Sequence, residues 1–533
     1  MVSQRELASV AELQAAIPDD GALLLWIDRN AWSDGAQQHW GCVVRSTGEP
    51  KWEQLPGTGT EQKWTYDDWD LPHKLSASAG GNASPSEIAS RACQIYNQRI
   101  ARVEKYLDGV KRLYVVPVDQ MAGVPVEVIT DQYTISYVPS GTFLARVKVR
   151  PRANGTSLLA LGDPVIPHVE AAKEPALPPG GLLITQVLPG GNAAQARLQT
   201  GDVLLRYAGA ELTSVEQLNT LIQKHGQESS VAVTVWRDGQ TARREIGSGK
   251  LGVLLDRQPA PEALAAKHKT DQMLLALARG GTWTELPGTA AEVSRLMTLV
   301  NGGEATVLTR SAASEQQLEE LRSSGKLAQF RYLHFATHGE PNNAKSFESA
   351  LILSQDQISR DVPSGGAKYY DGRLTANEVL ENWQLNADLV TLSACESALG
   401  RPGGGDGLLG FAQAFLLAGA RAVCLSLWKV DDTATALLMD RFYQNLLGKR
   451  AGLSQPLPKA DALAEAKRWL RNLSLDDATK LTADLTNSVA RGKNEKALKL
   501  TVPSTDANTA APDDHPFAHP RYWAAFILIG DPR

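Results

Sequence analysis

Residues 331–340 read Arg-Tyr-Leu-His-Phe-Ala-Thr-His-Gly-Glu, and residues 389–398 read Leu-Val-Thr-Leu-Ser-Ala-Cys-Glu-Ser-Ala. Both stretches begin as short apolar runs, which are typical of buried strands in a parallel sheet. The first run ends near His338 and the second near Cys395. Because ligands bind outside the carboxyl ends of strands in open α/β sheets, two neighbouring strands of this kind would bring His338 and Cys395 to one cleft.

A histidine beside a cysteine supports nucleophilic catalysis. A free thiol has a pKa near 8.5, so only a small fraction of it is thiolate at neutral pH. An imidazole at His338 can take the proton of Cys395 and later protonate a leaving amine. The backbone N–H groups of Gly339 and Cys395 are candidate oxyanion donors, each worth about 3–4 kcal/mol.

The alternative is that Cys395 is inert packing, since cysteine is among the most buried residue types. Two residues serve as internal controls. Cys424 sits inside an apolar run and is interpreted as core. His334 lies within its strand and is interpreted as a structural histidine.

Outward from this pair, strands alternate with helices, which indicates an α/β sheet. A turn at 33–35 between two apolar runs predicts a hairpin over residues 21–45. Further strands are predicted at 112–118, 157–161, 305–308, 332–336, 389–393, 422–427 and 524–529, and helices at 85–110, 261–279, 288–300, 313–325 and 432–447. Ser84 or Ser86 is the candidate cap of the helix that begins near residue 85.

The pattern changes in the middle of the chain. Residues 165–178 are rich in Pro and Ala and are interpreted as a linker. Short apolar runs at 182–187, 202–207 and 231–236, with one helix over 214–225, predict a compact β-rich module inserted into the α/β chain. Ser214 is a good cap for that helix, and Gln217 stands at the capping-box spacing.

Composition favours a soluble globular protein with two to four domains, because 533 residues are too many for one ordinary core. The net charge of −5, without a basic block, argues against nucleic acid as the main partner. The acidic N-terminus is not a secretory signal, and no apolar run reaches the roughly 18 residues of a membrane span. The four cysteines form no CxxC pair, which disfavours a zinc site or a disulfide framework, and we expect no metal or other cofactor. The simplest interpretation is a cytoplasmic protein of bacterial type.

The strings HFATHGE (334–340) and LSACESALG (392–400) resemble the two active-site motifs of the CHAT family of caspase-like proteases. Residues 157–164, 286–293, 426–432 and 519–525 also look like that family's landmarks, so the resemblance covers roughly 20–164 and 280–533. It implies a caspase-like (caspase-hemoglobinase) sheet flanked by helices, with His338 as the catalytic histidine and Cys395 as the nucleophile. The helical repeats that usually accompany the family are missing here, which puts its normal regulation in doubt.

The resemblance also suggests a substrate pocket near the catalytic strands. The candidate residues are Asp119, Glu396, Trp428, Asp431 and Asp432. An acid in the pocket would select a basic residue before the scissile bond. The alternative is that Asp431 and Asp432 simply cap the helix that starts there.

Residues 179–256 resemble a bacterial-type PDZ domain, through Leu-Pro-Gly-Gly-Asn-Ala-Ala (188–194) and Leu-Gln-Thr-Gly-Asp-Val-Leu (198–204). Gly180 and Gly181 would then form the carboxylate-binding loop, and Leu182, Leu183 and Ile184 the first groove strand. Such a loop offers successive N–H groups to a peptide C-terminus, and the strand edge adds the peptide to the sheet. Val215, Leu218, Leu221 and Ile222 could line the side-chain pocket or could be helix core.

The expected organisation is an N-terminal part of the CHAT region (1–164), a linker (165–178), the PDZ module (179–256) and the catalytic part (257–533). We expect a cysteine endopeptidase acting on a protein substrate, with a peptide C-terminus at the PDZ module for delivery or activation. By family analogy its setting is bacterial defence or regulated cell death, with a pore-forming or other operon-encoded protein as a candidate substrate. The alternatives are a PDZ-based scaffold with a silent protease site and another thiol enzyme, such as a transpeptidase.

Overall fold

The computed structural model describes residues 7–29, 38–147, 155–166, 177–188, 190–237, 239–264, 283, 286–300, 305–342, 345–356, 370–393, 406–487, 502–503 and 514–533. The chain divides into two compact units. Met1–Pro167 and Thr284–Arg533 together form the first, which we call the body, and His168–Trp283 form the second, which we call the insert.

The body is built on one 11-stranded sheet. Its spatial order is β13 (Ala305–Arg310), β6 (Leu158–Pro164), β14 (Tyr332–Ala336), β18 (Leu389–Leu392), β19 (Ala422–Ser426), β20 (Phe526–Gly530), β5 (Thr134–Tyr137), β4 (Arg112–Val116), β1 (Gly21–Arg29), β2 (Gln38–Arg45) and β3 (Lys51–Gln54). Neighbours from β13 to β19 are parallel, and so are those from β20 to β1. Strand β20 is antiparallel to β19, and it therefore joins two parallel half-sheets that run in opposite directions.

Strand β6 lies in the half-sheet that carries the C-terminal strands. It pairs with β13 on one side and with β14 on the other, although its position in the sequence groups it with the N-terminal part of the chain. At the far end of the sheet, β1 and β2 form the antiparallel hairpin that the sequence predicts.

Side chains alternate between the two faces of the sheet, as the pleat requires. In β14, Tyr332 and Ala336 face one hydrophobic core, and Leu333 and Phe335 face the other. The first core is covered by α9 (Pro287–Leu299), α13 (Asp432–Leu446), α14 (Lys459–Arg471), α15 (Leu475–Asn487) and α16 (Pro520–Trp523). The second is covered by α2 (Tyr66–Gly80), α3 (Pro85–Ile95), α4 (Val126–Ile129), α10 (Glu315–Ser323), α11 (Ala376–Asn382) and α12 (Asp406–Ala418). A smaller core beside β1 and β2 includes Leu144 of α5 (Gly141–Val147), and Leu13 and Ala16 of α1 (Val10–Ala16) pack against it.

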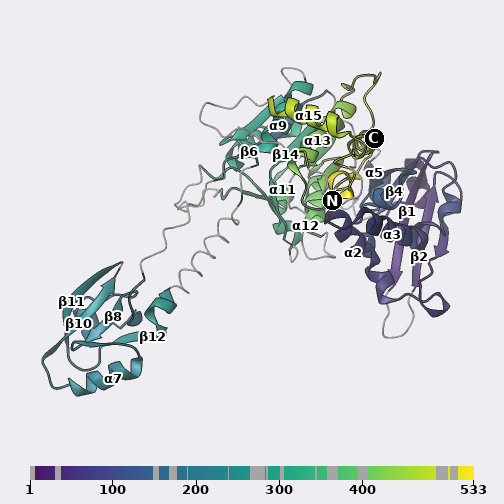
Figure 1. Ribbon diagram of the computed structural model, residues 1–533. Coiled ribbons are helices and arrows are strands. Elements are labelled where there is room, and N and C mark those ends of the chain that lie inside the picture. Colours follow the sequence, from purple (N-terminus) through teal and green to yellow (C-terminus); the bar gives the residue numbers. More distant parts are fainter. Residues whose placement is uncertain are drawn as a thin grey trace. The chain divides into compact units, whose positions relative to one another are not determined.

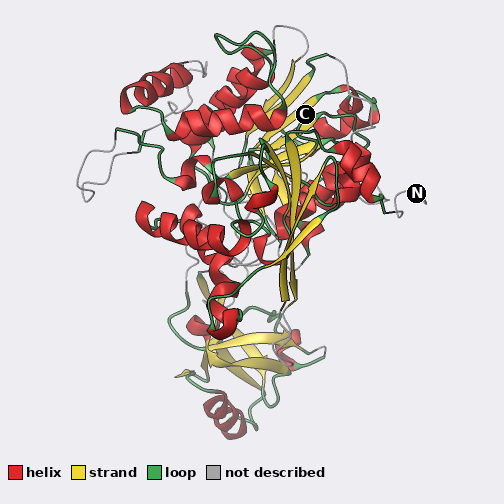
Figure 2. Ribbon diagram, turned by 90° about the vertical axis from the view of Figure 1, so that its right-hand side faces the viewer, coloured by secondary structure: helices red, strands yellow, loops and turns green. Residues whose placement is uncertain are grey.

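The pictures show this layering directly. In Figure 1, α9, α13 and α15 lie on one side of β6 and β14, and α11 and α12 lie on the other. Figure 2 shows the strands in yellow between red helices. Local sequence explains the helix starts, since Ser84 caps α3, Thr375 caps α11 and Asp431 caps α13 with their side chains.

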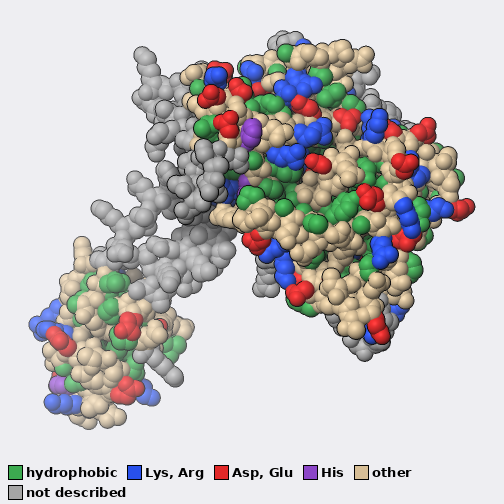
Figure 3. Space-filling view, turned by 45° about the vertical axis from the view of Figure 1, so that its right-hand side comes forward, with side chains coloured by type: hydrophobic (Ala, Val, Ile, Leu, Met, Phe, Trp, Pro, Cys, Tyr) green, Lys and Arg blue, Asp and Glu red, His purple; other side chains and the backbone are tan. Residues whose placement is uncertain are grey.

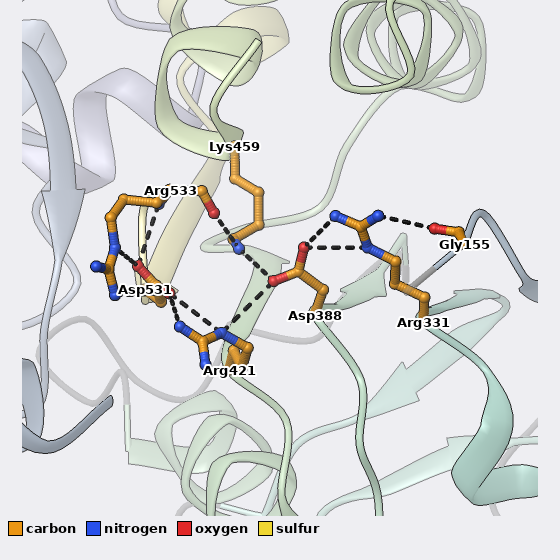
Figure 4. Close-up of polar contacts among 7 residues, drawn as sticks. All are labelled: Gly155, Arg331, Asp388, Arg421, Lys459, Asp531 and Arg533. Carbon is orange, nitrogen blue, oxygen red and sulfur yellow. Dashed lines mark hydrogen bonds and ion pairs between the residues drawn. The ribbon is translucent and has the colours of Figure 1, made fainter. Parts of the chain in front are cut away.

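A buried charge network closes one edge of the large sheet, where β14, β18 and β19 begin and β20 ends (Figure 4). Asp388 is at its centre, with Lys459 Nζ at 2.8 Å from one carboxylate oxygen and Arg331 Nη2 at 3.0 Å from the other. Arg421 links Asp388 to Asp531, which also pairs with Arg533. This edge is opposite to the one at which β14 and β18 end.

The insert has its own sheet, in the order β11 (Gln240–Gly247), β10 (Ser230–Arg237), β8 (Val203–Tyr207), β7 (Leu182–Val187) and β12 (Val253–Pro259), with β9 (Ala210–Glu211) on β8. The insert also contains the helices α6 (Asn192–Gln195) and α7 (Val215–Lys224), and residues 260–264 are helical as well. Its core is separate from that of the body and includes Leu182, Leu204 and Leu218. Ser214 caps α7 through the N–H of Gln217, as the sequence predicts.

On the face of the body shown in Figure 3, basic and acidic side chains are interspersed rather than gathered by sign. Among the described residues, every helix is too short or too polar to cross a bilayer.

Candidate functional site

The two decisive strands are direct neighbours. The first four residues of β14 each lie opposite the residue 57 positions later in β18, from Tyr332 and Leu389 to Phe335 and Leu392. The ladder continues one step further, because Ser393 N donates to Phe335 O at 2.8 Å. The same offset of 57 positions separates His338 from Cys395 in the sequence. Both residues therefore follow adjacent parallel strands at equivalent positions of the chain.

His338 is held by a second, smaller sheet. It begins β15 (His338–Glu340), which pairs with β16 (Ala350–Ile352), and β16 pairs with β17 (Arg373–Thr375). His338 stands opposite Ile352, and the hydroxyl of the preceding Thr337 donates to the carbonyl of the same Ile352. The histidine is only 6% exposed. Backbone pairing and burial thus restrict His338 to one place beyond the end of β14.

Cys395 and Glu396 lie outside the described residues, which stop at Ser393 and resume at Asp406 in α12. The structure therefore places His338 and Gly339, and it places the strand that leads to Cys395. Glu340, the residue after Gly339, is tied to Arg373 of β17 by an ion pair of 3.0 Å.

A polar cluster lies within the sheet behind the site. His334 is fully buried, with Nε2 at 2.9 Å from Glu292 Oε1 of α9 and Nδ1 at 3.2 Å from the Tyr443 hydroxyl of α13. Tyr443 also bonds Thr391 of β18 at 2.9 Å. Burial raises the pKa of Tyr443 far above its ordinary value, so this hydroxyl stays protonated. His334 thus occupies a structural position on the strand that leads to His338.

Two of the three described cysteines, Cys42 and Cys424, lie in surroundings that disfavour a nucleophilic thiolate. Burial raises the pKa of Cys424 to about 12 and that of Cys42 to about 12. Such thiols remain protonated at neutral pH and are poor nucleophiles. Cys93 is exposed on α3 of the N-terminal half.

The candidate pocket residues have identifiable structural contacts. Trp428 is buried, donates its indole N–H to Arg521 O at 3.0 Å and lies directly against Gly80. Asp431 caps α13, accepting from Ala434 N at 2.9 Å. Asp432 lies against Gly288 at the start of α9, where a Cβ on Gly288 would come within 2.9 Å of it. Asp119 follows β4 in the other half-sheet, at a φ of +48°.

The strand pair β15–β16 is a feature that the sequence patterns did not reveal. Glu292 and Tyr443 were also missed, because they meet His334 only after α9 and α13 pack on the sheet. One signal was available: residues 350–353 read Ala-Leu-Ile-Leu, a short apolar run that could have been interpreted as a strand.

In the insert, the strand expected to bind a peptide along its edge, β7, has a neighbouring strand on each side. Strand β7 is bordered by β8 on one side and by β12 on the other. Leu182 pairs with Leu204 and with Pro259, and Ile184 N donates to Asp202 O at 2.8 Å. Residues Leu182, Leu183 and Ile184 thus have no free edge for a peptide, and a Cβ on Gly181 would meet Leu204 O at 2.5 Å. Sequence periodicity identifies a strand but not its place in the sheet, which is why this assignment was wrong.

The edge of the insert's sheet beside β7 is β12, which pairs with β7 alone among the described strands. Val253 and Leu255 of β12, with Val215, Leu221 and Ile222 of α7, are partly buried apolar residues at the border of the insert's core. Leu218 is fully within that core.

Comparison with known proteins gives the following similarities. A family model described as the CHAT domain matches residues 90–531. Tetratricopeptide repeat protein 28 of Mus musculus is 29% identical over 231 residues, and that of Homo sapiens is 27% identical over 231 residues. Each match covers 39% of this chain and 7% of the relative, so the chain spans a small part of these relatives' length.

Three solved structures are also similar. The Saccharomyces cerevisiae separase–securin complex matches with a TM-score of 0.39 and 8% identity, over 97% of this chain and 30% of that one. The Arg-specific cysteine proteinase gingipain R matches with a TM-score of 0.32 and 8% identity, over 87% and 75%. The PDZ domain of the SdrC-like protein from Listeria innocua matches with a TM-score of 0.14 and 17% identity, over 15% of this chain and 96% of that one.

Proposed function

This chain belongs to the CHAT domain family, and we propose that it is a caspase-like cysteine endopeptidase using His338 and Cys395. The observation that carries the proposal is the register of β14 and β18. The same offset of 57 positions separates His338 from Cys395 in the sequence, and each of them follows one of these two adjacent parallel strands. The carboxyl edge of such a sheet is where ligands bind.

In the proposed reaction, His338 takes the proton of Cys395, and the thiolate attacks the scissile carbonyl carbon. The backbone N–H groups of Gly339 and Cys395 stabilise the oxyanion. The C–N bond then breaks, and His338 protonates the leaving amine. Water, activated by the same imidazole, hydrolyses the thioester and restores the thiol. The restricted position of His338 suits this role, because proton transfer requires the imidazole to lie within hydrogen-bond reach of the thiol and of the leaving amine.

Labelling with an electrophilic peptide probe tests the proposal. Cys395→Ala should abolish both labelling and peptide cleavage, and His338→Ala should abolish cleavage. Cys424→Ala is the matched control and should change cleavage little, because burial raises the pKa of that thiol to about 12. Full turnover by Cys395→Ala would refute the assignment. An unlabelled Cys395 in the intact chain would favour a scaffold with a silent site, and aminolysis products would favour a transpeptidase.

For substrate selection, we propose that an acid in the pocket favours Arg or Lys before the scissile bond. The Asp431 carboxylate is engaged at the start of α13, and Asp432 lies against α9. Glu396, which follows Cys395 directly, is therefore the first acid to test. Glu396→Gln should erase the preference in a peptide-library profile without removing thiol labelling. A wild-type profile that favours acidic or aliphatic residues would contradict this specificity.

We propose that the insert is a PDZ-type module that binds a peptide C-terminus along β12. Among the described strands β12 pairs with β7 alone, so its other edge can add a strand, and partly buried apolar residues of β12 and α7 can hold that strand's side chains. Ile222→Asp should weaken binding of C-terminal peptides to the full chain at least tenfold, as loss of about 1.4 kcal/mol implies. Thr220→Asp, on the exposed side of α7, is the control and should bind normally. Equal affinity in the two variants would exclude peptide binding beside β12 and α7.

Peptide binding at the insert would serve either delivery of substrate or activation. Under activation, a saturating C-terminal peptide added in trans changes cleavage of a short reporter several-fold, in keeping with couplings of about 1–3 kcal/mol. Under delivery, the reporter rate stays constant, and cleavage of a protein substrate falls by competition. Roles in bacterial defence or regulated cell death, with a pore-forming substrate, belong to this proposal and are tested by cleavage of proteins encoded beside the gene.

A further inference from the structure

The body segments that precede and follow the insert in the chain are hydrogen-bonded to each other. The first connection leaves from the end of β6 and the second enters at the start of α9. Asp163 N donates to Thr289 Oγ1 at 2.8 Å, and Thr289 Oγ1 donates to Leu286 O at 2.7 Å. Thr289 is only 6% exposed. One buried hydroxyl therefore fixes the end of β6 to the first turn of α9.

A second buried hydroxyl fixes the first connection to the small sheet. Val165 N donates to Ser354 Oγ at 3.0 Å, and Gln355 N donates back to Val165 O at 3.0 Å. Ser354 Oγ in turn donates to Arg310 O at the end of β13. The hydroxyl of Ser354 thus connects three separate segments of the chain.

Ser354 is close along the chain to the strand that holds His338. It lies two residues after Ile352, the last residue of β16. Ile352 is the pairing partner of His338 and accepts the hydrogen bond of Thr337. These contacts form a continuous path from residues 163–165 through Ser354 and β16 to the backbone of His338.

We infer that Thr289 and Ser354 are positioning residues that hold His338 in register and link it to both connections of the insert. This inference rests on the proposed function, since it assigns an effect on the pair formed by His338 and Cys395. The physical reason is that removal of the Thr289 hydroxyl takes an acceptor from the buried N–H of Asp163, and removal of the Ser354 hydroxyl takes one from the half-buried N–H of Val165. The segment must then shift to satisfy that N–H, and β16 moves with it.

The pH dependence of Cys395 alkylation by iodoacetamide, followed by mass spectrometry on the full chain, tests this inference. His338→Ala defines the profile of a thiol without its imidazole. Thr289→Val and Ser354→Ala should each shift the wild-type profile toward that of His338→Ala. A rise of about one unit in the thiol pKa lowers the reactive thiolate about tenfold at pH values below it. Thr289→Ser, which keeps the hydroxyl, should restore the wild-type profile.

Thr130→Val is the matched control for loss of a buried threonine hydroxyl. Thr130 lies in the N-terminal half, 7% exposed, and accepts from Gln132 N. Its replacement should leave the alkylation profile unchanged. Wild-type profiles in Thr289→Val and Ser354→Ala, with a clear shift in His338→Ala, would overturn the inference and leave the catalytic pair intact. No shift in His338→Ala would instead overturn the proposed function.

Discussion

Gly162, near the end of β6, leaves no room for a side chain. A Cβ there would lie 2.7 Å from Val293 Cγ2, 3.2 Å from Thr289 O and 3.4 Å from Ala336 O. The absence of a side chain lets α9 and the end of β14 approach β6 closely. This approach sets the geometry on which the bond between Asp163 and Thr289 depends.

Gly162→Ala should therefore destabilise the body by about 1–3 kcal/mol, the usual cost of overpacking. Chemical denaturation of the full chain measures this cost. Adding Val293→Ala removes one of the three contacts, so the double variant should lose less stability than the sum of the two single variants. Strictly additive losses would show that Val293 is not the obstacle.

The side chain of Asp431 caps the N-terminus of α13 and is also shielded from solvent. Burial raises the pKa of Asp431, and the backbone N–H groups of Thr433 and Ala434 only partly oppose it. A carboxyl whose folded pKa is raised costs stability once the pH exceeds its unfolded value near 3.9, because the folded state holds the proton more tightly.

Asp431→Asn should preserve the cap and remove this cost, so its stability should match or exceed that of the wild type at pH 7. Asp431→Ala should lose about 0.5–2 kcal/mol with the cap. Thermal unfolding at pH 4 and pH 7 separates the two effects. Equal losses in Asn and Ala variants would mean that the cap contributes nothing.

Among the elements, most strands of the large sheet could be predicted from periodicity, whereas only α3, α9, α10 and α13 among the described helices of the body were predicted. The runs 332–336 and 389–393 contain β14 and β18, and the helix expected at 432–447 is α13. Strand order could not be predicted, because it depends on contacts between distant segments. That is why the sequence could show neither that β6 lies between β13 and β14 nor that β7 is bordered by a strand on each side.

The same reasoning applies to the site. His338 could be singled out because a strand ends just before it, and the structure places it beyond β14. The hydroxyls of Thr289 and Ser354 could not be recognised, because each bonds a residue more than 100 positions away. Cys395 and Glu396 lie outside the described residues, and their roles stay predictions.

The charge network of Figure 4 joins the starts of several strands to the end of β20. Burial alone would raise the pKa of Asp388, but Lys459 and Arg331 outweigh it and hold the pKa below its ordinary value. A lowered carboxyl pKa contributes stability above the unfolded value near 3.9 and loses it as the pH falls through the folded value. The network therefore makes the body sensitive to acid below about pH 4.

Asp388→Asn should destabilise the body by about 3–5 kcal/mol, because it removes the buried carboxylate that Lys459, Arg331 and Arg421 share. Urea denaturation at pH 7 measures the loss, which should shrink as the pH is lowered. The control is Glu61→Gln in the pair with Lys63, whose side chains are 76% and 74% exposed. Such a surface pair contributes about 0–1 kcal/mol. Similar losses in both variants would contradict the role of burial.

At the scale of the whole molecule, the body and the insert have separate cores and should unfold in separate transitions. Leu218→Ala should lower only the insert's transition, by about 2–5 kcal/mol for a buried leucine. Asp388→Asn should lower only that of the body. Differential scanning calorimetry of the full chain resolves the two transitions. A single transition that responds to both substitutions would show that the units are one cooperative structure.

Strand β20 lies between β19 and β5, yet it is the last strand of the sheet in chain order. During translation, the ten other strands of this sheet emerge before residues 526–530 have been made. Until then β19 and β5 present unpaired edges, which are templates for pairing with other chains. The nascent protein is therefore most exposed to aggregation late in synthesis, and its two half-sheets become one only after the ribosome has delivered β20.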